Sequence, residues 1–209
     1  MKRGTLTVVS GFSGAGKGTL MRKLLDTYDN YALSISATTR LPRNGEKDGR
    51  EYFFKTDQEF QKMIENDELI EYAGYVNHFY GTPKDFVEEK LNAGKDVLLE
   101  IEIQGALKVK AKRPDTHLLF VAPPSAEELK RRLKQRGTED EETIKKRLAT
   151  AAKEAQYMKQ YDYIVINDDV SRCATEMHEI IQSFHALSSE KAELIDRLNK
   201  ELEEFRKEK

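Results

Sequence analysis

Short apolar runs alternate with longer amphipathic stretches along most of the chain. Brief apolar runs bounded by turn residues predict buried strands. We expect these strands at residues 5–10, 33–36, 96–101, 118–121 and 163–166. The run Val97-Leu98-Leu99 has no polar alternation, which indicates burial on both faces of a sheet. Since helical patterns separate the strands, the chain is predicted to be an α/β protein, a parallel sheet covered by helices.

The section from 36 to 82 departs from this alternation, because it combines short strands, one helix and many polar and aromatic residues. We predict that it forms a small mixed α+β lobe inserted into the core. Thr82 and Pro83 are expected to start the next helix, with Thr82 as its cap. The charged stretch 126–149 predicts a helical lid. The core of this single 1–209 domain is then expected to comprise residues 1–35, 83–125 and 150–209.

The stretch between the first strand and the first helix, expected at 16–27, matches the pattern G-x-x-x-x-G-K. Such a glycine-rich turn cradles phosphate, because its backbone N–H groups and the helix N-terminus point into one hollow. Lys17 adds a full positive charge for the β- and γ-phosphates. Gly18 stands where Ser or Thr commonly binds magnesium, and Thr19 follows one residue later. This loop predicts a P-loop NTPase fold.

Composition excludes several other classes. The net charge is −2 over 209 residues, so no overall field favours nucleic acid or a membrane surface. Cys173 is the one cysteine and the four histidines are scattered, which excludes a disulfide framework and a His/Cys metal cluster. No apolar run approaches membrane-spanning length, and Met1 to Gly4 lead into the first strand without a signal segment. We expect a cytoplasmic protein.

Two arginines and two tyrosines are candidates for a second anion site. Arg40 and Arg43 flank a proline in a turn-rich loop, and arginine forks match phosphate oxygens. Tyr52 and Tyr80 would add hydroxyl donors. Paired arginines also suit a solvated loop, but the phosphate cradle in the same chain favours ligand binding.

Glu71 lies within the half-apolar strand predicted at 69–76. It is either a solvent-facing strand residue or a reader of a purine base. Guanine presents two N–H donors on one edge, which suit a carboxylate, and an O6 acceptor, which suits the hydroxyl of Ser36 or Thr82. Adenine presents an acceptor at N1 and would be rejected.

Further charged residues follow the buried strand and line the predicted lid. Glu100 and Glu102 are two residues apart and are expected to share a face at the carboxyl end of the sheet, where ligands bind. They would order magnesium and its waters, or the incoming nucleotide, unless they are merely solvated. Arg132 and Arg136 are four apart on one predicted helix face. With Arg147 they would close over transferring phosphates, or form a solvated helix surface.

Several stretches of the sequence resemble the guanylate kinase family in family order, over about residues 4–185. The matching stretches are 36–43 (SATTRLPR), 49–54 (GREYFF), 79–82 (FYGT), 100–105 (EIEIQG), 122–125 (APPS), 136–139 (RGTE) and 167–169 (NDD).

The resemblance implies an enzyme that transfers the ATP γ-phosphate to GMP, recycling GMP in purine metabolism. It implies ATP and GMP as ligands and Mg²⁺ as MgATP, held mainly through nucleotide and water, with Glu100 nearest to it. The implied ATP-binding residues are Gly11, Phe12, Ser13, Gly14, Ala15, Gly16, Lys17, Gly18, Thr19 and Asn167. The implied GMP-binding residues are Ser36, Arg40, Arg43, Tyr52, Glu71, Tyr80, Thr82, Glu100 and Glu102. The implied catalytic residues are Lys17, Arg132, Arg136 and Arg147.

Two other functions fit parts of the sequence. A binding module of similar fold would lack catalysis, but the complete glycine loop with Lys17 argues against it. A kinase for another nucleoside monophosphate is disfavoured by Glu71. An apolar stripe on the last predicted helix leaves monomer and homo-oligomer open: Leu194, Leu198, Leu202 and Phe205.

Overall fold

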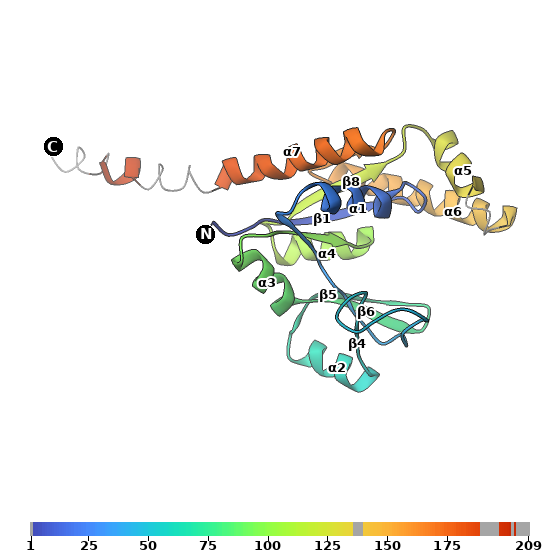
Figure 1. Ribbon diagram of the computed structural model, residues 1–209, viewed down its shortest axis with the longest axis horizontal. Coiled ribbons are helices and arrows are strands. Elements are labelled where there is room, and N and C mark those ends of the chain that lie inside the picture. The colour runs from blue at the N-terminus through green and yellow to red at the C-terminus, as the bar shows by residue number, and fades with distance from the viewer. Residues whose placement is uncertain (1, 136–139, 189–196, 202, 204–209) are drawn as a thin grey trace.

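The computed structural model describes residues 2–135, 140–188, 197–201 and 203 (Figure 1). Its main sheet has five strands in the order β2-β7-β1-β8-β9, and every neighbouring pair is parallel. The bounds are β1 Leu6–Gly11, β2 Tyr31–Leu33, β7 Asp96–Glu100, β8 His117–Ala122 and β9 Tyr163–Ile166. The predicted α/β class is confirmed.

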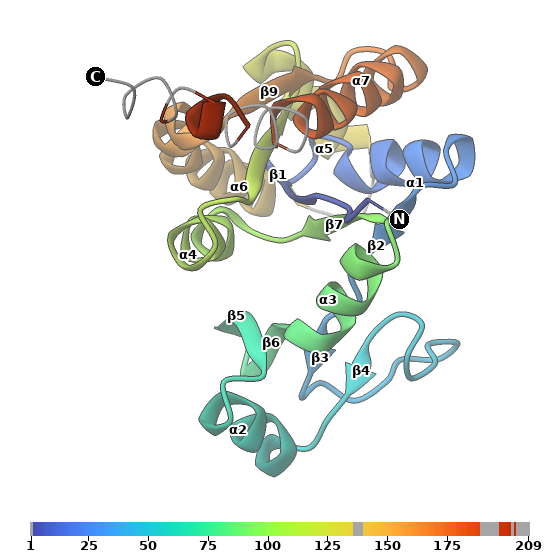
Figure 2. The ribbon, with the colours of Figure 1, turned by 90° about the vertical axis from the view of Figure 1, so that its left-hand side faces the viewer.

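Helices cover both faces of this sheet, which explains why its strands are nearly continuous apolar runs. Helix α1 (Lys17–Thr27) packs against α7 (Val170–Ser188) on one face. Helices α3 (Lys84–Asn92) and α4 (Ile103–Lys112) lie on the other face (Figure 1, Figure 2). Val8, Leu98 and Leu119, from three adjacent strands, have no exposed surface. The core therefore lies between the sheet and its two helical layers.

A second sheet forms a small lobe beside the main one (Figure 2). Its order is β4-β3-β6-β5, with bounds β3 Ala37–Thr38, β4 Phe53–Phe54, β5 Leu69–Tyr75 and β6 His78–Pro83. Helix α2 (Asp57–Glu65) covers it through the buried Phe60, and a capping box between Thr56 and Glu59 starts this helix. The lobe therefore has a small core of its own, formed by Ala37, Phe60 and Leu69.

One predicted strand is wrong, and one strand of the structure was not predicted. The strand expected at 33–36 does not form there, since β2 ends at Leu33 and β3 begins at Ala37, in the other sheet. Strand β6 was not predicted at all. It pairs antiparallel with β5 through a tight turn in which Val76 and Asn77 have φ of 46° and 64°. Because valine rarely adopts positive φ, the sequence carries little sign of this hairpin.

The predicted lid region contains two helices, α5 (Ala126–Gln135) and α6 (Glu141–Glu154), followed by a 3₁₀ turn, η1 (Ala155–Gln160). The Ser125 hydroxyl accepts the Glu128 N–H at 3.1 Å, and Asp140 caps α6. Arg136, Leu194, Leu202 and Phe205 lie outside the described residues, and Leu198 is exposed. Within the described ranges, no helix has the length and apolar character needed to cross a membrane.

Candidate functional site

The glycine-rich loop joins the central strand β1 to α1. Gly16 is the N-cap of α1 at φ 90° and has no side chain to bond the first N–H groups of the helix, which stay available to an anion. A Cβ on Gly16 would stand 2.6 Å from the Asn167 Nδ2, so the position requires glycine. The Lys17 Nζ donates to the carbonyls of Gly11 at 2.6 Å and Phe12 at 3.2 Å. The lysine side chain is therefore bound by backbone carbonyls of its own loop.

Two residues predicted to belong to the site, Asn167 and Arg132, donate hydrogen bonds to the backbone of this loop. The buried Asn167 donates from Nδ2 to the Ala15 carbonyl at 2.8 Å. Arg132 donates to the Ala15 carbonyl at 3.2 Å and to the Asn167 carbonyl at 2.7 Å, and pairs with Glu128 through Nε at 2.7 Å. These contacts join α5 and the end of β9 to the phosphate loop.

Helix α6 also contacts the loop. Arg147, from α6, donates to the Ser13 hydroxyl. Arg132 from α5 and Arg147 from α6 thus both contact the same loop. Arg136, the third arginine predicted for this group, lies outside the described residues.

A cavity of about 350 Å³ opens between the small lobe and the connection from β7 to α4. Six of the residues predicted to bind GMP line it: Ser36, Tyr52, Glu71, Tyr80, Glu100 and Glu102. They come from both sheets, so folding gathers residues that are up to 66 positions apart in the sequence. The other six lining residues were not predicted as site residues: Ala73, Gly74, Gly81, Ile101, Gln104 and Gly105.

Glu71 is the buried carboxylate of this cavity, with 7% of its surface exposed. The Thr82 hydroxyl donates to its Oε1 at 2.9 Å. Burial raises the pKa of Glu71, while the Thr82 hydrogen bond and the charges of Lys108 and Lys112 oppose that rise. A buried acceptor with one oxygen already fixed is suited to selecting donors on a ligand.

The prediction that Thr82 caps the next helix is wrong. That helix, α3, begins at Lys84 with Pro83 as N-cap and no side-chain cap bond. Instead, pairing of β6 with β5 brings the Thr82 hydroxyl to Glu71. The expectation that Glu100 and Glu102 share a strand face is also wrong, because β7 ends at Glu100 and Glu102 is the N-cap of α4. Both still line the cavity.

Because Gly105 has no side chain, the Glu71 carboxylate has room to lie against α4. Gly105 belongs to the first turn of α4, and a Cβ there would stand 3.1 Å from the Glu71 Oε2 and 3.3 Å from the Ile101 Cδ1. The positive end of the helix dipole at this turn favours a nearby carboxylate. An isolated glycine inside a helical pattern was the one sequence signal for this close approach.

Glu154 is a further acid that the sequence did not single out. Burial raises its pKa, the Glu102 charge raises the pKa further, and Lys17 lowers it. Glu154, at the end of α6, therefore interacts electrostatically with both Lys17 of the phosphate loop and Glu102 of the cavity. Nothing in its helical, charged sequence context distinguishes it from a solvated glutamate.

Arg40 lies beside Tyr52, one of the residues that line the cavity, with its guanidinium carbon 5.3 Å from the centre of the Tyr52 ring. Its guanidinium forms a two-pronged ion pair with Glu46, with both N···O distances 2.9 Å. Arg43, three residues on, has an exposed side chain. Arg40, Tyr52 and Tyr80 are thus gathered together, since the two tyrosine rings are 6.0 Å apart.

A phosphate loop after the central strand of a parallel sheet, together with a second cavity between that sheet and an inserted lobe, defines a P-loop protein with room for two ligands. The comparisons with known proteins agree. The family model described as Guanylate kinase matches residues 3–184. The guanylate kinase of Caldanaerobacter subterraneus subsp. tengcongensis is 54% identical over 86% of this chain and 87% of its own. That of Clostridioides difficile is 49% identical over 97% and 99%.

A solved structure agrees as well. Guanylate kinase from Anaplasma phagocytophilum superposes with a TM-score of 0.67 at 34% identity, covering 87% of this chain and 86% of that chain. The chain belongs to the guanylate kinase family.

Proposed function

We propose that this protein transfers the γ-phosphate of ATP to GMP, giving ADP and GDP. The observation that carries the proposal is the buried Glu71 carboxylate, held by Thr82 in a cavity close to a complete phosphate loop. About 50% identity to guanylate kinases over most of the chain supports the same activity.

The two nucleotides would bind in separate places. ATP phosphates would lie on the loop from Gly11 to Thr19, where N–H groups at the start of α1 and the Lys17 ammonium face them. The guanine base would enter the lobe cavity, with Glu71 accepting its N1–H and N2–H. Ser36 lines the same cavity and would serve O6.

The chemistry needs little from the protein beyond positioning and charge. The GMP phosphate is already ionised and attacks without a general base. Arg40, Arg43, Tyr52 and Tyr80 would hold it, while Lys17, Arg132 and Arg147 would neutralise charge on the transferring group. Residues 36–82 and 126–149 would act as GMP lobe and lid, and Arg136 would belong to that lid.

Magnesium would enter with ATP and neutralise phosphate charge. Gly18 supplies no hydroxyl, and within the described ranges no group of three or more His, Cys, Asp or Glu could hold a metal ion. This donor set fits an ion carried by the nucleotide and its waters, with the cavity-lining Glu100 and Glu102 ordering those waters.

A coupled assay of ADP release tests the proposal. With MgATP present, GMP should support turnover, and AMP, CMP and UMP at the same concentration should support at least ~10²-fold less, because buried polar pairing rejects the wrong base strongly. Comparable rates with AMP would contradict the guanine assignment. ADP release that no monophosphate stimulates would contradict the phosphotransfer itself.

A further inference from the structure

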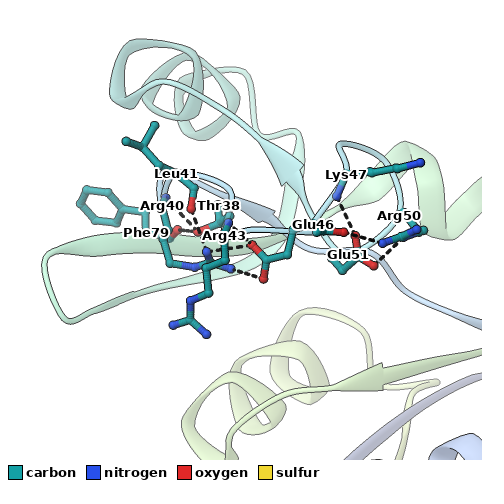
Figure 3. A network of polar contacts seen from close by, with 10 residues as sticks. Thr38, Arg40, Leu41, Arg43, Glu46, Lys47, Arg50, Glu51 and Phe79 are labelled. Carbon is teal, nitrogen blue, oxygen red and sulfur yellow. Dashed lines mark hydrogen bonds and ion pairs between the residues drawn. The ribbon is translucent and has the colours of Figure 1, made fainter.

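Glu46 accepts three hydrogen bonds within the loop that carries the two arginines proposed to bind phosphate (Figure 3). Its Oε1 accepts from the Arg40 Nη2 and its Oε2 from the Arg40 Nη1, both at 2.9 Å. The two side chains are largely buried, with 12% of Arg40 and 18% of Glu46 exposed. A pair of parallel charged hydrogen bonds fixes the plane of a guanidinium as well as its position.

The same carboxylate also fixes the backbone of Arg43. Its Oε2 accepts the Arg43 N–H at 2.7 Å, and the Glu46 N–H donates to the Arg43 carbonyl at 3.0 Å. Gly45, at φ 89°, allows the chain to turn back between them. Glu46 therefore ties together the two residues proposed to hold one phosphate (Figure 3).

The contacts of Arg40 leave part of its guanidinium for a ligand. Glu46 takes one N–H from each terminal nitrogen, and the Leu41 carbonyl accepts from Nη1 at 2.8 Å. Of the five N–H donors of arginine, Glu46 and Leu41 leave the two on the Nε–Nη2 edge. The Tyr80 hydroxyl, itself proposed to hold the phosphate, also interacts with the Arg40 guanidinium. The guanidinium also packs over Tyr52 at 5.3 Å and Phe54 at 5.9 Å, so it has little freedom to rotate.

We propose that Glu46 is a positioning residue for the substrate phosphate. It locks Arg40 with its Nε–Nη2 edge presented to the phosphate and sets the backbone of Arg43 for the same anion. This inference rests on the proposed function, since it assumes that GMP is the ligand of the lobe. The opposite role would be competition, in which Glu46 occupies the arginine until phosphate displaces it.

Calorimetry of GMP binding to Glu46→Gln tests the proposal. The amide keeps the shape but places an NH₂ group against the guanidinium, so the Arg40 fork is lost. We expect the dissociation constant of GMP to rise about 10-fold, a typical effect of losing a charge-assisted hydrogen bond. The dissociation constant of guanosine, which has no phosphate, should change by less than about 2-fold because the base site is untouched.

Glu51→Gln is the matched control. Glu51 lies in the same loop and makes the same kind of contacts, accepting the Lys47 N–H at 2.8 Å and the Arg50 Nε at 2.5 Å (Figure 3). Arg50 is largely exposed, with 57% of its side chain accessible. We expect the affinity of this variant for GMP to match that of the unmodified protein.

A double-mutant cycle separates positioning from general damage to the loop. The amide oxygen in Glu46→Gln can still accept the Arg43 N–H, so this variant removes mainly the Arg40 fork. Adding Glu46→Gln to Arg40→Ala should therefore change GMP affinity by less than about 2-fold. An equally large effect in both backgrounds would overturn the proposal, and so would tighter GMP binding by Glu46→Gln, which indicates competition. Absence of GMP binding by the unmodified protein would instead refute the proposed function.

Discussion

The Thr82 hydroxyl donates a hydrogen bond of 2.9 Å to the Glu71 carboxylate, and both side chains are buried. They lie on adjacent strands, β6 and β5, of the small lobe. Because Thr82 engages one oxygen and α4 packs against the other, the carboxylate has a defined orientation before any ligand arrives. Such an arrangement reduces the ordering cost of binding.

Glu71→Gln should weaken GMP binding at least ~10-fold and leave ATP binding unchanged, because an amide cannot accept both guanine donors and one buried group stays unpaired. Thr82→Val should weaken GMP binding by a smaller factor, since the Glu71 carboxylate loses only the hydrogen bond from Thr82. Glu68→Gln, an exposed glutamate before β5, is the control. Calorimetry with each nucleotide measures all three variants, and unchanged GMP affinity in Glu71→Gln would remove Glu71 from the site.

The affinity for guanosine should depend on pH through Glu71. Burial raises the pKa of this carboxyl above its ordinary value of 4.5, and only the ionised form accepts both guanine donors. Affinity should therefore fall as pH decreases through the raised pKa and be constant above it. Guanosine is the right probe because it lacks a phosphate that titrates nearby. A Glu71→Gln variant with the same pH profile would contradict this assignment.

The raised pKa of Glu71 affects the stability of the protein in the opposite direction to its affinity for guanosine: stability decreases as pH rises. Because the folded protein favours the protonated form, this group contributes most to the free energy of unfolding below about pH 4.5. Its contribution is lost as pH rises through the folded-state pKa. Denaturant titrations of the unmodified protein and Glu71→Gln, compared across this range, should converge at low pH and separate in favour of the glutamine variant above it.

Gly105→Ala should impair base recognition without unfolding the protein. Alanine in a helix normally adds about 0.5–1 kcal/mol of stability relative to glycine. Here its Cβ would press on the Glu71 Oε2 at 3.1 Å and move the carboxylate within the cavity. We expect guanosine affinity to fall several-fold, with ATP affinity and the melting temperature nearly unchanged. Ala111→Gly, at an exposed position of α4, controls for helix propensity, and equal guanosine affinity in Gly105→Ala would refute the steric role.

Lys17→Ala should abolish most turnover while GMP affinity stays close to normal. The lysine lies at the start of α1, bonded to the loop carbonyls of Gly11 and Phe12, and the GMP cavity is lined by other residues. Loss of a charge that serves the transferring group lowers kcat rather than acceptor binding. Lys23→Ala, an exposed lysine on the same helix, is the control. A normal kcat in Lys17→Ala would exclude the loop from catalysis.

Local pattern was enough to predict the parallel sheet and the phosphate loop. Each of these depends on residues that are neighbours in the sequence, so periodicity and contiguous motifs carry the information. The charged and hydroxyl residues proposed to bind GMP were also identified in advance, and six of them do line one cavity.

Only the tertiary structure decided how those residues are used. Thr82 suits a helix cap as well as a partner for Glu71, and the choice depends on pairing of β6 with β5 through a turn that valine rarely adopts. The closeness of Gly105 to Glu71 depends on packing of α4 against β5, 34 positions apart in the sequence. The sequence alone therefore determined which functional side chains this protein has. Which partner each side chain contacts was decided by long-range packing, because the same side chain fits several local environments equally well.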